Sequence, residues 1–353
     1  MPQFLFYFSL VLICFTLIPL VRNDFWAFRV FEYPRLQKLV LNLALLVVYL
    51  YFFPSDTLGR VALALLFFNL CYLIYQVFPF TILGKKQIID ARKPNDERNI
   101  AILIANVYQD NRQSESYLSL IKKCDPDVVL MVETNVWWQQ QMDAIGETYP
   151  HQLKVPLENT YGMIFYSRLP LRNGSINFLV KEDIPSIETE VQLKSGQWVK
   201  LYCLHPEPPV PQENPRSTER DKEILIVAEK AKDSDLPVIV MGDLNDVAWS
   251  YTTELFGKVS GLLDPRRGRG FFNSFNAKYF FLRFPLDHIF CSTNFTLSGI
   301  RRMESCGSDH FPMCVNLQLD PPAEKLNEKP VADQEDLALA EEKINAATDG
   351  VDQ

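Results

Sequence analysis

The pentapeptide Gly242-Asp243-Leu244-Asn245-Asp246 places a carboxylate and a carboxamide directly after the apolar run 236–241. That run is short and rich in β-branched residues, which predicts a buried strand. Residues two apart on an extended chain point to the same side, so Asp243 and Asn245 can face one ligand. A carboxylate that holds a water or a metal, beside an amide that donates a hydrogen bond, suits chemistry at a phosphate group. The alternative is a polar turn that caps a helix starting near Ala248.

Other polar residues also stand at the ends of expected strands. In chain order they are Asn106, Glu133, His205, Asp243 with Asn245, and Asp309-His310, while Asp287 lies just inside its strand. Turns at strand ends usually carry Gly, Pro or Ser as well, so turns alone do not explain this series. In layered αβ proteins the strand ends converge on the ligand site. We therefore expect these side chains to meet in one site.

The elements that must position these residues are expected over residues 99–319. Apolar and alternating runs predict strands at 99–107, 127–132, 163–166, 175–180, 187–193, 198–204, 236–241, 286–290, 296–303 and 311–319. Amphipathic patterns predict helices at 114–123, 134–145, 217–232 and 251–256. The first strand is apolar on both faces, which indicates a sheet that is covered on both sides.

Three apolar segments precede this region, at residues 4–20, 39–53 and 61–80. A helix that spans a bilayer needs about 20 largely apolar residues. Buried core helices are the alternative, but no polar stripe of helical period runs through these segments. A signal peptide is not indicated, because Met1-Pro2-Gln3 lacks a basic start and no small-residue cleavage site follows. The sequence therefore predicts an integral membrane protein with a three-helix anchor in residues 1–80.

Basic residues are distributed unevenly around the three segments. They gather at Arg22, Arg29, Arg35 and Lys38 and again at Lys85, Lys86, Arg92 and Lys93, whereas the opposite side has only Arg60. Positive residues favour the cytoplasmic side, so the chain after residue 80 is expected in the cytoplasm, at an inner or plasma membrane. The seven cysteines show no disulfide or zinc pattern, which agrees with a reducing compartment.

Two charged stretches flank the region of expected strands and helices. Residues 81–98 are polar and contain proline, and we interpret them as a linker. Residues 320–353 are acidic with few large apolar residues, which predicts a disordered tail with at most a transient helix at 335–346. The net charge of −8 disfavours a broad nucleic-acid surface, although the tail contributes to that charge.

Several motifs resemble, in their order and rough spacing, those of the endonuclease/exonuclease/phosphatase superfamily. They are Asn106, Val132-Glu133-Thr134, Tyr161-Gly162, Tyr166-Ser167-Arg168-Leu169-Pro170, Leu204-His205-Pro206, the pentapeptide at 242–246, Asp287-His288-Ile289-Phe290 and Ser308-Asp309-His310-Phe311-Pro312. The resemblance covers residues 99–319 and points to a membrane-anchored, bacterial-type member. It implies an α+β fold, a four-layer αββα sandwich with two mostly antiparallel sheets, and cleavage of phosphoester bonds with Mg²⁺ or Mn²⁺.

The resemblance also implies a metal site. Glu133 is expected to be the principal ligand, because it is a hard oxygen donor suited to Mg²⁺. Asn106 contributes to the metal or phosphate shell, and Asp309 lies near the metal. The family often carries a second polar residue two positions after Asn106, where this chain has Tyr108. A second ligand from that strand is therefore left open.

The catalytic roles follow from the same resemblance. His310 is expected as the general base or the phosphate-activating group, and Asp287 would fix its tautomer. Asp243 would orient the attacking water, and which of Asp243 and His310 takes the proton stays open. Asn245 and His205 would stabilise charge on the phosphoryl oxygens.

The substrate is less well defined by the sequence. The basic turn at Arg266, Arg267 and Arg269 is either a contact for a substrate phosphate or a solvated turn. Nuclease-like hydrolysis of a phosphodiester is the first expectation. A phospholipid, phosphoinositide or sphingomyelin head group is the alternative, and a catalytically inactive membrane scaffold is another. No obligate protein partner is inferred.

Overall fold

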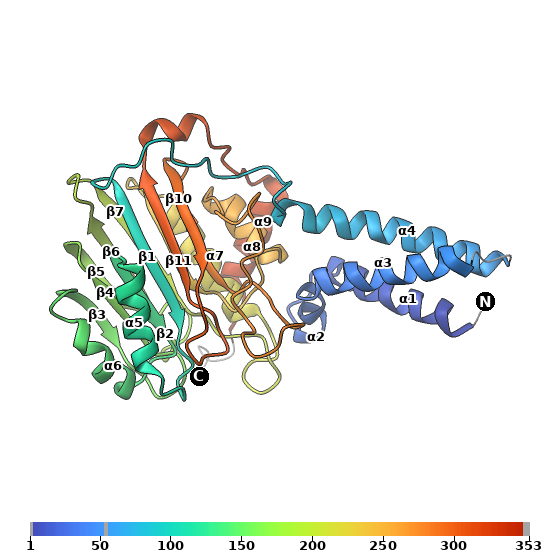
Figure 1. Cartoon of the computed structure of the whole chain (residues 1–353), viewed down its shortest axis with the longest axis horizontal. Helices are drawn as coiled ribbons and strands as arrows, with labels where there is room; N and C mark the ends of the chain where they lie inside the picture. Colours follow the sequence, from blue (N-terminus) through green and yellow to red (C-terminus); the bar gives the residue numbers. More distant parts are fainter. Residues whose placement is uncertain (1–2, 53–55, 349–353) are drawn as a thin grey trace.

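Two β-sheets packed face to face form the centre of residues 99–319 in the computed structural model, which describes residues 3–52 and 56–348 (Figure 1). One sheet has six strands in the order β10-β11-β1-β2-β4-β3, and the other has five in the order β5-β6-β7-β8-β9. The pairs β1–β2 and β7–β8 are parallel. The other strand pairs recorded in the described residues are antiparallel.

The elements are bounded as follows. The strands are β1 (Asn99–Asn106), β2 (Val128–Val132), β3 (His151–Val155), β4 (Met163–Ser167), β5 (Leu171–Asn177), β6 (Ser186–Gln192), β7 (Trp198–Leu204), β8 (Val238–Asp243), β9 (Asp287–Cys291), β10 (Phe295–Arg302) and β11 (Met313–Leu319). The helices are α1 (Gln3–Leu17), α2 (Trp26–Arg29), α3 (Arg35–Phe52), α4 (Thr57–Val77), α5 (Ser114–Cys124), α6 (Val136–Met142), α7 (Thr218–Lys232), α8 (Tyr251–Ser260) and α9 (Gln334–Asn345). Short 3₁₀ turns are η1 (Ile18–Leu20), η2 (Val30–Glu32), η3 (Phe78–Phe80), η4 (Asp143–Ile145) and η5 (Pro321–Lys325).

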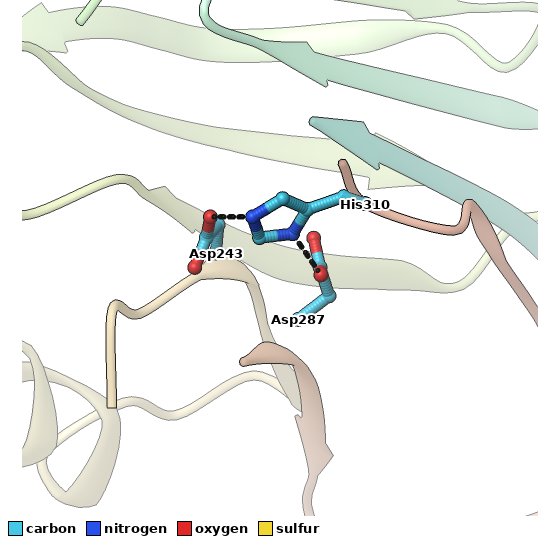
Figure 2. A group of neighbouring side chains, drawn as sticks. All are labelled: Asp243, Asp287 and His310. Carbon is cyan, nitrogen blue, oxygen red and sulfur yellow. Dashed lines mark hydrogen bonds and ion pairs between the residues drawn. The ribbon is translucent and has the colours of Figure 1, made fainter. Parts of the chain in front are cut away.

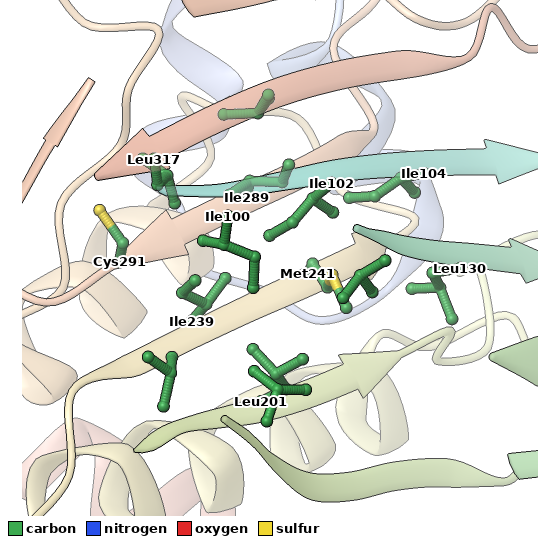
Figure 3. Close-up of a cluster of buried hydrophobic side chains, with 14 of the residues drawn as sticks. Ile100, Ile102, Ile104, Leu130, Leu201, Ile239, Met241, Ile289, Cys291 and Leu317 are labelled. Atoms are coloured by element: carbon green, nitrogen blue, oxygen red, sulfur yellow. The ribbon is translucent and has the colours of Figure 1, made fainter. Parts of the chain in front are cut away.

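The main core lies between the two sheets (Figure 3). Ile100, Ile102 and Ile104 on alternate positions of β1 pack in one cluster with Ile239 and Met241 of β8. The intervening residues of β1 are also buried, against helices on the other side of the sheet. Burial of one such side chain stabilises the fold by about 1.5–3 kcal/mol. The expected sheet covered on both sides is therefore confirmed.

Helices complete two outer layers. Helices α5 and α6 cover the six-stranded sheet, with Tyr117 and Trp138 buried against it. Helices α7, α8 and α9 cover the five-stranded sheet, where Ile224 and Phe256 are buried. The result is the expected four-layer αββα sandwich.

The acidic C-terminal segment differs from the disorder expected for residues 320–353. Helix α9 packs on α7 and α8, and Ala340 is buried there. Lys343 pairs with Asp24 at 2.7 Å and with Asp221 at 2.9 Å. The packing of α9 cannot be predicted from its composition, because its sequence is polar and acidic like that of a solvent-exposed segment. A few ion pairs and small apolar contacts hold it on the domain. Residues 349–353, part of the same expectation, lie outside the described residues.

The expected linker is also bound to the domain. Ile88 is buried in the main core. Ala91 N donates to Leu297 O, and Leu297 N donates to Ile89 O, both at 2.9 Å. Residues 88–91 therefore run along β10 as an attached segment.

Three helices are long and apolar enough to cross a membrane: residues 3–20, 35–52 and 57–80. Only 17–28% of each segment is buried, which suits lipid-exposed helices and argues against the alternative of core helices. Between them, Asn69 donates to Asn42 at 2.8 Å, and Asn42 donates to Leu66 O at 2.9 Å. Residues 1–2 and 53–55, which the expected anchor included, lie outside the described residues.

The loop between the first two apolar helices holds the helical bundle against the sandwich. Trp26 N donates to Pro215 O at 2.8 Å. The indole Nε1 of Trp249 donates to Glu32 O, also at 2.8 Å. Figure 1 shows α2 at the point where the helical bundle meets the sandwich.

Candidate active site

Strand direction brings five polar side chains to one end of the sandwich. Asn106 ends β1, and Glu133 follows the parallel strand β2. Strand β11 runs antiparallel to β1, so His310, just before it, returns to the same end. In the second sheet Asp243 ends β8 and is in register with Asp287, the first residue of the antiparallel strand β9. We call Asn106, Glu133, Asp243, Asp287 and His310 the catalytic cluster, after the role that the family resemblance implies for them.

His310 lies between two carboxylates (Figure 2). Its Nδ1 is 2.8 Å from Asp287 Oδ2, and its Nε2 is 3.5 Å from Asp243 Oδ2. All three residues are at least 95% buried. Burial by itself lowers the pKa of His310, but the carboxylates of Asp287 and Asp243 outweigh it and raise that pKa to about 10. The expected pairing of Asp287 with the imidazole is present in the geometry.

Asn106 links the two sheets across the site. Its Nδ2 donates to Glu133 Oε1 at 2.7 Å and to Asp243 Oδ2 at 3.0 Å. Burial raises the pKa of Glu133 to about 7. Burial also raises the pKa of Asp243, against the opposing effect of His310. The positive charge that the protein places near Glu133 and Asp243 is therefore too small to keep their pKa values in the usual range.

His205 lies beside this cluster and is buried. Its Nε2 is 4.0 Å from Asp243 Oδ2, and its Nδ1 has no hydrogen-bond partner among the described residues. Burial lowers its pKa to about 4. A neutral imidazole with a free nitrogen can take part in a hydrogen bond to a bound phosphate.

Asn245 has a partner within the chain. Its Nδ2 donates to Pro206 O at 2.9 Å, and its backbone N donates to Asp243 Oδ1 at 3.0 Å. The amide thus joins the pentapeptide to the loop after His205, in addition to any contact with a substrate. Asp309 is half-buried, and Ala277 N donates to its backbone oxygen at 2.6 Å. Its side chain is not a member of the compact group of Asp243, Asp287 and His310.

The basic turn differs from the expected substrate contact. Arg266 is buried, pairs with Asp264 at 2.8 Å and approaches His288 Nδ1 at 2.7 Å. His288 is a satisfied core group, since its Nε2 also contacts Asp246 O at 2.8 Å. The turn supports the strand that carries Asp287, because Arg266 Nη1 donates to Asp287 O at 3.3 Å.

The other two arginines of the turn are also engaged within the protein. Arg267 lies 3.9 Å from Glu254 and over the ring of Phe80. Arg269 donates to Ile88 O at 2.5 Å and to Asp90 at 2.6 Å. Arg266 and Arg269 are thus held by short contacts within the protein, whereas Arg267 makes one longer ion pair and stays partly exposed.

Three supporting residues were not singled out from the sequence. Tyr33 Oη donates to Asn245 O at 3.0 Å, and Arg220 Nη1 donates to the same oxygen at 2.8 Å. Tyr33 lies in the anchor loop and Arg220 in a charged helix, so no local pattern links them to the site. Ser274 is a third case, because its hydroxyl accepts from Asp287 N at 3.0 Å.

Backbone conformation at the site is unusual. Glu133 and Asn245 have φ of 58° and 50°, in the left-handed region that non-glycine residues rarely adopt. Such residues are often found at functional sites. Gly242 is required for a different reason: a Cβ there would lie 1.9 Å from Leu204 O, so β8 could not approach β7 as closely.

The donor set of the cluster suits a hard divalent cation. Asp243 and Asp287 form a compact group with the His310 imidazole, and Asn106 joins a third carboxylate, that of Glu133, to Asp243. Asp287 Oδ1 is buried without a hydrogen-bond partner in the described residues. Oxygen donors of this kind are those that Mg²⁺ and Mn²⁺ prefer. The residues present therefore fit a divalent metal ion.

Comparison with known proteins agrees with this fold. Residues 103–310 match the Endonuclease/Exonuclease/phosphatase family, whose members hydrolyse phosphoester bonds and generally use divalent metal ions. The chain belongs to this family. No curated protein sequence matches it.

Solved structures resemble the sandwich at low sequence identity. A humanized D. rerio TDP2 with 14 mutations is 19% identical, with a TM-score of 0.53, 63% of this chain covered and 99% of that chain. D. rerio TDP2 complexed with single strand DNA product is 20% identical, with a TM-score of 0.52 and coverages of 62% and 99%. An endonuclease/exonuclease/phosphatase from Beutenbergia cavernae is 15% identical, with a TM-score of 0.51 and coverages of 63% and 72%. Likeness at this level establishes the fold.

Proposed function

We propose that this protein is a membrane-anchored, divalent-metal-dependent phosphodiesterase that uses water as the nucleophile. The observation that carries the proposal is His310 held between Asp287 and Asp243, next to the Asn106–Glu133 pair. This arrangement combines proton-transfer groups with an excess of buried carboxylate. Both are needed when water attacks a charged phosphoryl group.

Each residue has a distinct part in the proposed reaction. Asp287 holds Nδ1 of His310, so that Nε2 faces Asp243. As the attacking water forms its bond to phosphorus, its proton passes to the Asp243–His310 pair. The P–O bond to the leaving oxygen breaks, and that oxygen takes up a proton from the same pair or from solvent. Glu133, with Asn106 and Asp309, would hold Mg²⁺ or Mn²⁺, which supplies neutralisation of phosphoryl charge when bound. His205 would contact a phosphoryl oxygen.

The test is an assay of the purified full-length chain on bis(p-nitrophenyl) phosphate, plasmid DNA, single-stranded RNA, phosphoinositide and sphingomyelin. We expect hydrolysis with Mg²⁺ or Mn²⁺ and none in EDTA. Full activity in EDTA contradicts the metal assignment. No hydrolysis of any substrate with either metal favours the inactive scaffold instead.

Two substrate classes have support. D. rerio TDP2 shares the fold and has been solved with a single strand DNA product. Against nucleic acid stand the net charge of −8 and the three arginines, which are engaged within the protein. Nucleic-acid binding generally depends on several basic residues that face the phosphates.

One surface feature favours a phosphoester of a membrane lipid. Residues 279–282 are Tyr, Phe, Phe and Leu, with exposed fractions of 62%, 70%, 80% and 53%. The loop is joined to the site through Ala277 N and Asp309 O, at 2.6 Å. Its Phe281 O accepts from Gln37 of α3 at 2.8 Å, at the end of an apolar helix. The apolar tip therefore lies between the active site and the anchor, where it can enter the membrane interface.

Loop variants separate the two classes. We expect Phe280→Ser with Phe281→Ser to reduce hydrolysis of vesicle-borne lipid while bis(p-nitrophenyl) phosphate is hydrolysed as before. Phe178→Ser, at an exposed position outside this loop, is the matched control. Equal activity of loop variant and wild type on vesicles argues against the lipid class.

We further propose that the catalytic domain faces the cytoplasm. Support comes from the basic residues beside the domain-proximal ends of the three helices. A reporter fused to the C-terminus is expected to be active only on the cytoplasmic side. Activity only on the opposite side contradicts this topology.

A further inference from the structure

A cavity of about 560 Å³ lies between the apolar helices and the catalytic domain; we call it the anchor cavity. Its wall includes the last residues of the first apolar segment, the first residue of the second and the last turns of the third. Helix α8 and residues 262–267 contribute the opposite wall. Small-molecule sites typically measure about 300–1,000 Å³. Because all three segments end here, the cavity lies at the depth of lipid head groups.

Arg35 gives the anchor cavity an unbalanced charge. It lines the cavity, and only 9% of it is exposed. Within the described residues, no hydrogen bond or ion pair is recorded for its guanidinium group. The carboxylates of Glu254 and Glu32 attract Arg35 electrostatically, but no ion-pair contact with either is recorded. The guanidinium group therefore keeps its hydrogen-bond donors available to an anion in the cavity. Arg22, also on the wall and exposed, has no recorded partner within the described residues either.

The remaining charged groups on the wall are already paired. The pairs are Glu32 with Arg29 at 3.3 Å, Glu254 with Arg267 at 3.9 Å, Asp264 with Arg266 at 2.8 Å and Lys258 with Asp336 at 2.8 Å. Among the charged residues of the wall, those with no recorded contact partner within the described residues are therefore Arg22 and Arg35. Guanidinium groups bind phosphate through two parallel hydrogen bonds, which suits a phosphate ligand here.

The rim of the cavity is apolar and faces the bilayer. Leu20 and Tyr75 line it, and their exposed fractions are 62% and 76%. Acyl chains can lie against this rim while a phosphate enters between the arginines. A free phosphate ion would gain nothing from these contacts. No residue of the catalytic cluster lines the cavity, so the site is separate from the active site.

We propose that the anchor cavity binds the phosphate of an anionic phospholipid through Arg22 and Arg35. The binding does not depend on the catalytic chemistry, so it is measured without substrate. The lipid would fill the space between anchor and domain and fix their relative position. Anionic lipids are abundant at the cytoplasmic surface of membranes, the side on which we place the domain.

The test is lipid titration of delipidated full-length protein in neutral detergent, followed by native mass spectrometry and by the melting temperature. Dioleoyl-phosphatidylglycerol is expected to bind at least about tenfold more tightly than dioleoyl-phosphatidylcholine, the ratio that a hydrogen-bonded charge provides. Arg35→Gln and Arg22→Gln are each expected to weaken phosphatidylglycerol binding about tenfold. Arg60→Gln, at the opposite end of α4, is the matched control and should bind as wild type.

Three results overturn the proposal. They are equal binding of the two lipids, unchanged phosphatidylglycerol binding by the folded arginine variants, and displacement of the lipid by millimolar inorganic phosphate, which would define a site for a free anion. Arg35 is buried, so the melting temperature of its lipid-free variant is measured first. If that variant does not fold, Arg22→Gln decides, because Arg22 is exposed and its replacement leaves the interior intact.

Discussion

Asp243 and Asp246 lie three residues apart in the chain, but each belongs to a different buried cluster of charged residues. Asp243 belongs to the catalytic cluster, while Asp246 belongs to a second group at the anchor, the junction cluster of Arg29, Glu32, Arg220, Asp221, Asp246 and Lys343. Arg29 and Arg220 both lie 3.1 Å from Asp246. Asp243 accepts neutral hydrogen bonds from Asn106 Nδ2 and Asn245 N, both at 3.0 Å. The basic groups recorded near it in the described residues are two imidazole nitrogens, at 3.5 and 4.0 Å.

The different neighbours shift the pKa values of Asp221 and Asp243 in opposite directions. Burial alone would raise the pKa of Asp221 in the junction cluster, but Lys343, Arg220 and Arg29 outweigh it and hold that pKa well below its usual range. Burial raises the pKa of Asp243, because the neighbouring imidazoles do not compensate for it. In the junction cluster the positive and negative side chains balance, so it stabilises the fold without a ligand. The catalytic cluster has more carboxylates than basic groups, so it can bind a cation.

The largest expected effect is the loss of activity in Glu133→Gln. Removing the principal carboxylate should lower kcat at least about 10³-fold, because metal and charge stabilisation are lost together. In EDTA the variant should melt no lower than wild type, since it replaces a buried acid with a neutral amide. Glu147→Gln, an exposed position, serves as control. Retention of Mn²⁺-dependent stabilisation and activity would contradict the role of Glu133.

The second effect tests whether His310 and Asp287 act as a unit. General acid–base groups contribute about 10²–10⁴-fold, so His310→Ala should lose at least about a hundredfold in kcat. Because Asp287 acts through His310, the double variant with Asp287→Ala should be scarcely worse. His151→Ala, on β3, should leave kcat unchanged. If the two single losses multiply, Asp287 does not serve His310.

The third effect is on stability, in the junction cluster. Arg29→Met removes a buried partner of Asp246 and should cost about 3 kcal/mol. At about 2–4 °C for each kcal/mol, the melting temperature falls by about 6–12 °C. The exposed Arg60→Met should change it little. If Arg29→Met instead lowers kcat at saturating substrate as much as His310→Ala does, the distinction between the two clusters is wrong.

The two clusters also differ in how far their residues can be predicted from the sequence. Residues of the catalytic cluster stand at strand ends, and the direction of the strands brings these ends together. The pattern of apolar strands followed by polar residues was therefore enough to predict which residues form the site. The junction cluster joins Arg29, Asp246 and Lys343 over more than 300 residues of chain. The spacing of residues within a single helix or strand cannot predict contacts between residues so far apart in the chain. The same limit applies to the basic turn, where Arg266 is paired with an acid two residues before it and turned inward.

The smallest expected effects concern the two lysines that hold α9. Lys343 is 8% exposed and contacts two carboxylates, so Lys343→Met should cost about 2 kcal/mol, within the range for hydrogen bonds to charged groups. Lys258 is 42% exposed and pairs with Asp336 alone, so Lys258→Met should cost about 0.5 kcal/mol, as partly exposed pairs do. Both substitutions keep a long apolar side chain, which leaves packing on α9 nearly unchanged. Thermal unfolding of the two variants in parallel gives the order, and proteolysis of α9 should accelerate in Lys343→Met first. Equal costs would mean that burial does not set the strength of these pairs, and that the junction cluster is no stronger than an ion pair at the surface.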